Sequence, residues 1–320
     1  MEDKIKIKLD LKDKRILALL DENARYSNSQ IARKVGLSKP AVEYRIQRLM
    51  KNNAIFEFYS VIDFTKLGYS LYKVYFKFQN ANIEEEKKIS DYWINSKNSI
   101  WVAQCRGKAD LAVTILAKSN FEFGQILSSF MDKFSKFILD KEILLTESTS
   151  IYLKDKENSE LSYKTPSNYE DLDETDKKIL SALSIDARIN IIDLAEKIKL
   201  TRDVINYRIK KLIKNKIITN YRCYLNLPNL GINHYKVIFR TKNFNEKYEK
   251  ELRSYISNHK KATQFLKLIG SWDLEVEFET ETEDEIYSIL TEIRKKFSEI
   301  IRDFDLIRIT QTYKYNYFPF

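Results

Sequence analysis

The segment that decides the fold reads LDLKDKRIL at residues 9–17 and returns as LDETDKKIL at residues 172–180. Asp13 thus corresponds to Asp176, an offset of 163 residues. The same offset places YRI of residues 44–46 on the YRI that starts at Tyr207, and YKV of residues 72–74 on the YKV that starts at Tyr235. A chain that repeats at one fixed period uses one architecture more than once. The 320 residues therefore predict two copies of one multidomain unit.

Each half changes its hydrophobic period partway along. Residues 9–53 show helical spacing in three segments, which predicts three short helices. The third helix follows Ser38, a good N-cap, and carries Pro40 in its first turn. Thr201 has the same place in the second copy. The predicted buried stripes of these two helices are Val42, Ile46 and Leu49 in the first copy and Ile205, Ile209 and Leu212 in the second.

Beyond Gly68 the pattern alternates, and the order of segments becomes β-α-β-β-α-β, a ferredoxin-like unit. The predicted fold class is α+β, with a winged helix-turn-helix domain followed by a ferredoxin-like domain in each half. The polar segment that contains Pro166 is predicted to be a linker. The expected boundaries are a head at 1–60, a ferredoxin-like domain at 61–153, a linker at 154–171, a second head at 172–223 and a second ferredoxin-like domain at 224–320.

The composition is typical of an ordinary globular protein, with 43% hydrophobic and 32% charged residues. No run approaches the roughly 18 apolar residues of a membrane span, and the first residues lack the apolar core of a signal peptide. We therefore expect a cytoplasmic protein without a membrane partner.

The residue types that carry catalysis and metal binding are scarce. Cys105 and Cys223 lie in apolar segments, so we expect free, buried thiols rather than a disulfide or a zinc site. His234 and His259 have no Ser, Cys or Asp partner in a pattern that indicates nucleophilic catalysis. The sequence predicts no catalytic residue, no metal and no cofactor.

The positive charge is confined to the predicted heads. Residues 1–55 carry 13 basic and 7 acidic side chains, and residues 172–218 carry 11 and 7, whereas the rest of the chain sums to −1. Such a distribution is expected if the heads approach a phosphate backbone.

The third helix of each head presents cations and base-reading polar groups outward, as a helix in the major groove does. We therefore predict contacts with double-stranded DNA. The first copy supplies Ser38, Lys39, Pro40, Glu43, Tyr44, Arg45, Gln47, Arg48 and Lys51; the second supplies Thr201, Arg202, Asp203, Asn206, Tyr207, Arg208, Lys210, Lys211 and Lys214. For Arg45 and Arg208, ion pairing with acidic groups of the first helix is the equally weighted alternative.

These motifs resemble one family. The opening Leu-Asp-x-x-Asp-x-x-Ile-Leu, the Ala-Arg pairs that end at Arg25 and Arg188, and Leu-Ser or Leu-Thr before a Tyr-Arg-Ile helix are similar to the helix-turn-helix of the Lrp/AsnC (leucine-responsive/asparagine-responsive) transcription regulators. The Leu-Gly dipeptides that end at Gly68 and Gly231 resemble the entry to the family's effector-binding domain. The chain departs from the family by carrying Asn53 and Lys216, where a Gly usually precedes the strand after the recognition helix.

The resemblance implies a transcription regulator whose activity responds to a small-molecule effector such as an amino acid. It implies that the sheet domains pair within one chain and that the chains associate further. It also implies ligand-binding residues at two Gly-x-x-Asp turns, which are Gly107 with Asp110 and Gly270 with Asp273. The turns differ, because Trp272 in the second replaces Ala109 in the first.

A further asymmetry lies in the predicted sheets. Glu275, Glu277 and Glu279 alternate with apolar residues and so share the face that the family uses for dimerisation, and Lys73 and Lys77 occupy that face in the first half. We expect either that these opposite charges pair the two halves or that the Glu row pairs within its own sheet.

Two alternatives to a regulator come from other classes. Siroheme decarboxylases resemble the same family and use the fold as an enzyme. The strands that would line their tetrapyrrole pocket correspond here to residues 101–106 and 264–269, which contain no His. The second alternative is a metabolite sensor whose heads no longer bind DNA.

Overall fold

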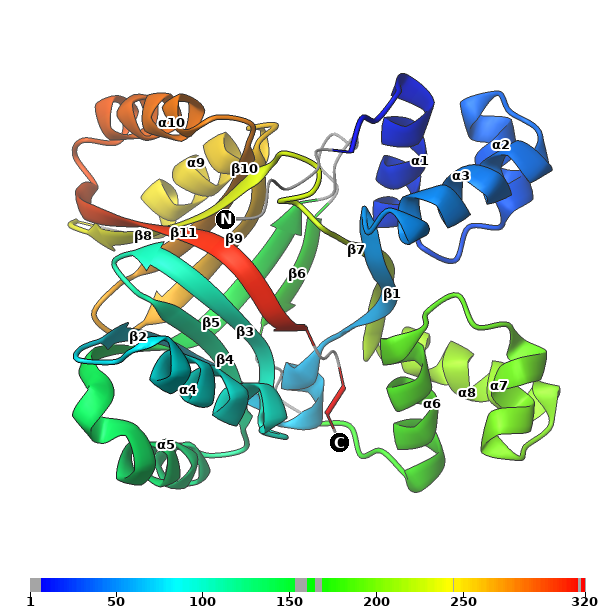
Figure 1. Ribbon diagram of the computed structural model, residues 1–320, viewed down its shortest axis with the longest axis horizontal. Helices are drawn as coiled ribbons and strands as arrows, with labels where there is room; N and C mark the ends of the chain where they lie inside the picture. Colours follow the sequence, from blue (N-terminus) through cyan, green and yellow to red (C-terminus); the bar gives the residue numbers. More distant parts are fainter. Residues whose placement is uncertain (1–6, 153–159, 165–168, 244, 316–317, 320) are drawn as a thin grey trace.

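The computed structural model describes residues 7–152, 160–164, 169–243, 245–315 and 318–319. Figure 1 shows a layered sheet-and-helix body on one side and two helical heads on the other, with a two-stranded ribbon between them.

Each head contains the three helices predicted from the sequence. Their helices begin at residues whose side chains accept backbone N–H groups, such as Ser27, Ser38 and Thr201, which satisfies donors that a helix start leaves open. The apolar stripes predicted for the third helices are buried. The helices are α1 (Leu11–Glu22), α2 (Asn28–Val35) and α3 (Lys39–Lys51) in the first half and α6 (Glu174–Ile185), α7 (Ile191–Ile198) and α8 (Arg202–Lys214) in the second.

The ribbon joins the two halves strand to strand. β1 (Ile55–Ile62) follows the first head, β7 (Ile218–Leu225) follows the second, and they pair antiparallel with Phe58 opposite Cys223. Asn53 and Lys216, just before these strands, adopt left-handed conformations with φ of 54° and 57°. The turn that a family glycine usually makes is therefore kept here without glycine.

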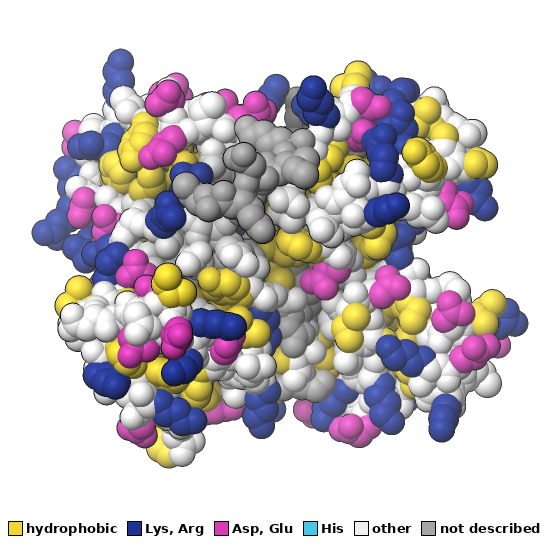
Figure 2. Space-filling model, in the orientation of Figure 1, with side chains coloured by type: hydrophobic (Ala, Val, Ile, Leu, Met, Phe, Trp, Pro, Cys, Tyr) yellow, Lys and Arg dark blue, Asp and Glu magenta, His cyan; other side chains and the backbone are white. Residues whose placement is uncertain are grey.

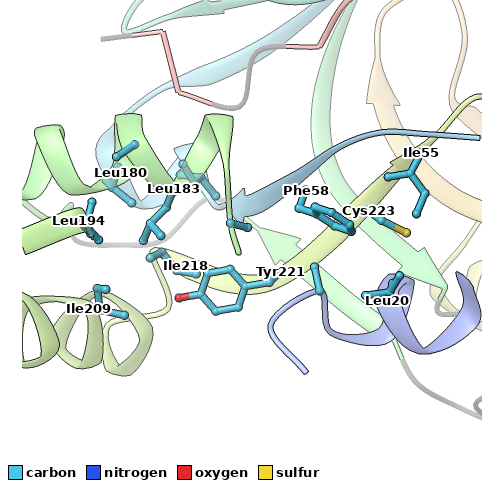
Figure 3. Packing of buried hydrophobic residues seen from close by; sticks show 14 of the residues in the cluster. Leu20, Ile55, Phe58, Leu180, Leu183, Leu194, Ile209, Ile218, Tyr221 and Cys223 are labelled. Carbon is cyan, nitrogen blue, oxygen red and sulfur yellow. The ribbon is translucent and has the colours of Figure 1, made fainter. Parts of the chain in front are cut away.

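The two heads and the ribbon share one hydrophobic core. Figure 3 shows Leu20 of α1 and Leu183 of α6 on either side of the ribbon, with Phe58 and Tyr221 packed between them. Because neither head encloses its core alone, the heads and the ribbon form one packed unit.

The ferredoxin-like units are present twice, as predicted. The first contains β2 (Ser70–Phe78), α4 (Ile83–Asn95), β3 (Ser99–Gly107), β4 (Leu111–Ala117), α5 (Asn120–Phe134) and β5 (Ile138–Tyr152). The second contains β8 (Asn233–Thr241), α9 (Glu246–Ser257), β9 (Ala262–Ile269), β10 (Leu274–Thr280), α10 (Glu283–Lys296) and β11 (Ile301–Tyr315). Short 3-10 turns lie at Phe64–Leu67 and Ser135–Phe137.

The last strand of each half, β5 or β11, joins the two sheets into one closed sheet. β11 of the second half pairs with β3 of the first, and β5 of the first half pairs with β9 of the second. Because β2 pairs with both β4 and β5, the strand order β2-β4-β3-β11-β8-β10-β9-β5 returns to its start. The helices lie outside this closed sheet, α4 and α5 on one side and α9 and α10 on the other (Figure 1). Its interior holds a small apolar cluster that includes Ala103, Ile238 and Ile307.

The expected linker contains a strand. Within the segment 154–171, residues Glu160–Lys164 form β6, which pairs with the end of β5. The Tyr163 hydroxyl also lies 2.8 Å from Thr219 Oγ1 at the ribbon. The sequence did not predict this strand, because a polar composition does not prevent pairing with an open strand edge. Pro166 lies outside the described residues.

Both cysteines are free and buried, as expected, and burial raises the pKa of the Cys105 thiol to about 12. In the part of the chain that the structure describes, no three His, Cys, Asp or Glu side chains are placed to hold a metal ion. No helix among those residues has the length and apolar character to span a bilayer.

Candidate nucleic-acid interface

The outer face of α3 carries exposed side chains of several kinds. Lys39, Pro40, Glu43, Gln47 and Lys51 are exposed. Tyr44 also projects outward, and 65% of its surface is accessible. An exposed aromatic ring among polar groups can contact sugar and base edges of a duplex.

The outer face of α8 is the counterpart of the α3 face. Tyr207, the equivalent of Tyr44, is 67% exposed. Three lysines extend along the same helix, in contrast to the mixed polar set on α3. The exposed predicted residues of α8 are Arg202, Asp203, Asn206, Tyr207, Lys210, Lys211 and Lys214.

Three of the predicted cations bind acidic groups of their own head. Arg45 Nη1 lies 2.6 Å from Asp10 and 2.8 Å from Asp13, and Arg48 Nη2 lies 2.5 Å from Asp13. In the second head Arg208 pairs with Asp173 and Asp176. Donation of hydrogen bonds to Asp10 and Asp13 raises the pKa of Arg45. For Arg45 and Arg208 this is the alternative that the sequence left open. Arg48 was predicted to point outward, but it is half-buried and also ties the third helix to the first.

The predicted residues Ser38 and Thr201 serve as helix caps. Ser38 Oγ accepts a hydrogen bond from Ala41 N at 3.3 Å, and Thr201 Oγ1 accepts one from Val204 N at 3.4 Å. Both side chains are at the exposed helix start, where backbone N–H groups favour an anion such as a phosphate.

Reciprocal contacts fix the two heads relative to each other. Arg25 Nη1 donates to the Ala187 carbonyl at 2.8 Å, and Arg188 Nη1 donates to the Ala24 carbonyl at 2.6 Å. Each guanidinium also lies over a ribbon ring: Arg25 is 5.4 Å from the ring centre of Tyr221, and Arg188 is 5.2 Å from that of Phe58. The Ala-Arg pair was noticed in the sequence, but its role was missed because its partner lies about 160 residues away.

Figure 2 shows Lys and Arg side chains on both heads, interspersed with Asp and Glu, and a hollow between the heads. The net positive charge of each head is thus spread over its surface.

The Gly-x-x-Asp turns lie apart from the heads. Asp110 accepts hydrogen bonds from Phe78 N at 2.8 Å and Lys77 Nζ at 2.9 Å. Asp273 accepts from Thr241 N at 2.6 Å and Thr241 Oγ1 at 2.9 Å. Both carboxylates therefore hold their own sheet together. Their role in binding a ligand stays a prediction.

The glycines of these turns face the opposite half of the chain. Gly107 has φ of +102°, and a Cβ there would lie 2.5 Å from the Leu306 carbonyl oxygen. A Cβ on Gly270 would lie 2.9 Å from the Ile143 carbonyl oxygen. The two glycines are thus needed for the close approach of β3 to β11 and of β9 to β5.

Trp272 is a packed residue of the second turn. It is 1% exposed, and its Nε1 donates to Glu142 Oε2 at 3.1 Å. The repeat equivalent of Glu142 is Asp305, which lies 3.3 Å from Lys108. The equivalent residues Glu142 and Asp305 thus join the halves differently, by a hydrogen bond from Trp272 on one side and an ion pair with Lys108 on the other.

The acidic row of β10 meets lysines from both halves inside the closed sheet. Glu275 pairs with Lys73 of the first half and lies 2.9 Å from Lys236 of its own sheet. Glu277 pairs with Lys236 and lies 2.8 Å from His234 Nε2. Both predicted alternatives are therefore present. Lys77 was wrongly grouped with this row, because it lies near the surface and binds Asp110.

Burial by itself would raise the pKa of Glu275 and Glu277, but attraction to Lys236 and, for Glu277, His234 lowers both below the usual value. The same attraction keeps Lys236 charged, with a pKa above its usual range despite burial. Burial lowers the pKa of Lys73 in the same cluster, although the nearby Glu275 opposes this shift.

Comparison with known proteins agrees with this architecture. Residues 9–50 match the AsnC-type helix-turn-helix domain, and residues 172–219 match a winged helix-turn-helix DNA-binding domain. The HTH-type transcriptional regulator Rv2324 of Mycobacterium tuberculosis is 33% identical over 110 residues, which are 34% of this chain and 74% of that protein. The uncharacterized HTH-type transcriptional regulator PF1231 of Pyrococcus furiosus is 32% identical over 130 residues, which are 40% of this chain and 83% of that protein.

A solved structure that matches both halves at once is the siroheme decarboxylase NirDL, also solved with an iron-uroporphyrin III analogue. Its TM-score is 0.64 at 13% identity, and the match covers 97% of this chain and 94% of that one. At this identity the likeness concerns the fold.

The heads, the ribbon and the paired ferredoxin-like units define a two-headed winged helix-turn-helix protein. The chain belongs to the Lrp/AsnC family and carries two of the family's units in tandem.

Proposed function

We propose that the protein is a sequence-specific DNA-binding transcription regulator that acts in the cytoplasm. The observation that carries the proposal is the pair of capped third helices, α3 and α8, which present exposed polar and cationic side chains from heads held together by Arg25 and Arg188. A fixed pair of recognition helices suits two half-sites on one face of a duplex.

The two heads differ at the positions that would reach bases. Glu43 and Gln47 of α3 correspond to Asn206 and Lys210 of α8. Asn can pair with adenine and Glu can accept from cytosine, and a good base contact contributes about 1–3 kcal/mol of discrimination. One chain should therefore favour an operator with two unlike halves.

Selection of binding sites from a random DNA library tests this proposal. The expected result is an asymmetric site, with Asn206→Ala relaxing specificity in one half only and Gln47→Ala in the other. A short perfect palindrome as the best site of a single chain would contradict it, as would recovery of no enriched sequence.

Two other functions have their own readouts. The fold likeness to NirDL makes a tetrapyrrole enzyme the second candidate. Tetrapyrrole absorbance in the purified protein would favour that function. A protein that binds a metabolite but shifts no duplex at low salt would instead be a sensor with inactive heads.

We further propose that chains self-associate and that a small-molecule effector, such as an amino acid, modulates DNA binding. The exposed surfaces of the Gly-x-x-Asp turns, including Ile269 at 56% exposure, are available to another chain. Self-association would place the same head on both halves of a longer operator.

A further inference from the structure

A cavity of about 490 Å³ lies where the ribbon meets the closed sheet. Both halves form its wall: β1 contributes Tyr59, β3 contributes Trp101, β7 contributes Tyr224, and β11 contributes Tyr315. This size falls within the usual range of small-molecule sites, about 300–1,000 Å³. The cavity is separate from the Gly-x-x-Asp turns, whose glycines and aspartates are not part of its wall.

The lysines and the arginine that line the cavity are already paired with carboxylates. Arg222 donates hydrogen bonds of 2.9 and 2.8 Å to the two oxygens of Asp21. Lys73 and Lys236 are bound to Glu275. An anionic ligand would have to displace these carboxylates, and it would also meet the acidic side chains of Asp63, Glu147 and Glu279 in the wall. The balance therefore disfavours an anionic ligand.

The remaining wall is aromatic, with hydroxyl groups between the rings. The ring centres of Tyr59 and Tyr315 are 5.6 Å apart, and those of Tyr224 and Tyr315 are 4.9 Å apart. Thr146 Oγ1 is buried in this wall without a hydrogen-bond partner among the described residues. Tilted aromatic rings and a buried hydroxyl of this kind suit an aromatic molecule that carries a hydrogen-bonding group.

The position of the cavity connects it to the heads. The wall includes Tyr59 and Val61 of β1 and residues 222–225 of β7, and these two strands carry the recognition heads on their other side (Figure 1). A ligand that contacts the ribbon stabilises those positions of the ribbon to which it binds more tightly. It therefore shifts the populations of the ribbon positions.

We propose that this cavity is a binding site for an aromatic or heteroaromatic molecule without negative charge, and that its occupancy changes the affinity of the heads for DNA. The second clause rests on the proposed function. By linkage, DNA must change the affinity for the ligand by the same factor.

The test uses two dyes on the purified full chain: Nile red, which is uncharged and planar, and 1-anilinonaphthalene-8-sulfonate, which is an anion. Thr149 and Thr312 are repeat equivalents that line the cavity, so Thr149→Phe and Thr312→Phe each fill part of it. The matched control is Thr291→Phe on the exposed face of α10. Circular dichroism checks that each variant is folded.

We expect one Nile red per chain, binding at least tenfold weaker in each cavity variant, unchanged within twofold in the control, and at least tenfold tighter than the sulfonate. Saturating Nile red should change the affinity for a selected duplex at least threefold in the unaltered chain and in the control. Because Thr149 and Thr312 belong to different strands, one variant still decides the result if the other does not fold.

Equal Nile red binding in all folded variants would overturn the site, and tighter binding of the sulfonate would overturn the ligand class. An unchanged duplex affinity at saturating dye would overturn the coupling to the heads. Dye binding in the cavity by a chain that binds no duplex would support the ligand site and contradict the proposed function alone.

Discussion

The two halves meet in two regions, the heads and the closed sheet, and they meet in different ways. In the heads, backbone contacts made by one half are repeated by the other: Ala24 N donates to the Tyr221 carbonyl at 2.7 Å, and Ala187 N donates to the Phe58 carbonyl at 2.8 Å. The ion pair of Arg222 with Asp21 is not repeated, because the repeat equivalents of these residues are Tyr59 and Ser184. In the closed sheet, Glu275 and Glu277 of one half have as repeat equivalents the uncharged Ala112 and Thr114.

This difference shows what fusion of two units in one chain permits. A two-fold interface between identical chains requires that each contact occurs twice. Within one chain, each side of the interface can change independently. The heads repeat their backbone contacts, while the closed sheet contains a one-sided charge cluster, and a contact of this kind can specify the partner.

Lys236→Met should have the largest effect on stability. It leaves Glu275 and Glu277 buried without their shared cation, and loss of one partner from a buried ion pair costs about 3–5 kcal/mol. Its repeat equivalent Lys73→Met should cost less, about 1–3 kcal/mol, because Glu275 keeps Lys236. Urea unfolding of both variants measures the difference.

The control for this pair is Lys77→Met, near the surface, which should change stability by less than about 1 kcal/mol. Equal losses of stability for Lys236→Met and Lys73→Met would show that the closed sheet is energetically symmetric. That result would contradict a one-sided charge cluster.

In the heads, we expect substitutions at repeat-equivalent residues to cause similar losses of stability. Arg25→Ala and Arg188→Ala each remove a guanidinium that binds carbonyls of the other head, at a cost of about 1–3 kcal/mol. The carbonyl contacts are reciprocal, but Arg188 also donates to Asn28 Oδ1 at 2.9 Å, so the two losses should agree within about 1 kcal/mol, with the larger loss in Arg188→Ala. Thermal unfolding of the two variants measures them, and a difference above about 1 kcal/mol would break the symmetry assigned to the heads.

Glu57 of β1 should give a smaller, pH-dependent effect. Burial raises the pKa of this carboxyl from 4.5 to about 7, whereas its repeat equivalent on β7 is the uncharged Asn220. A carboxyl with a raised pKa in the folded state contributes stability below about pH 4.5, and this contribution is lost as the pH rises through about 7.

Glu57→Gln should therefore remove the part of the decline in stability between about pH 4.5 and 7 that this group causes. Urea unfolding at several pH values measures the decline, and Asn220→Ser on the paired strand is the control. An unchanged pH profile in Glu57→Gln would show that Glu57 is not the group responsible.

Local patterns predicted much of this molecule. The repeat, the three helices of each head, the order of strands and the buried stripes that include Val42 and Ile205 all follow from spacing along the chain. The strand β6 was missed, because pairing with an edge depends on which edge is open in the folded protein.

The contacts between the halves could not be predicted in the same way. Arg25 and Ala187 are far apart in sequence, and neither residue type indicates the other as its partner. The cavity was missed for a related reason, since single residues such as Tyr59, Trp101 and Tyr315 from many strands form its wall. Pairing of Lys73 with Glu275 was predicted only because the alternation of polar and apolar residues assigned both side chains to the face that joins the two halves.

The central claim is that the third helices bind DNA, and one matched pair of variants tests it most directly. Arg48 and Lys211 are repeat equivalents, but Arg48 is bound to Asp13, whereas Lys211 is exposed on α8. Fluorescence anisotropy with a selected duplex, over a range of salt concentrations, measures the affinity and its salt slope. Lys211→Ala should weaken binding to all sequences alike and reduce the slope by about one, while Arg48→Ala should reduce it less. Unchanged affinity and slope in folded Lys211→Ala would contradict the claim.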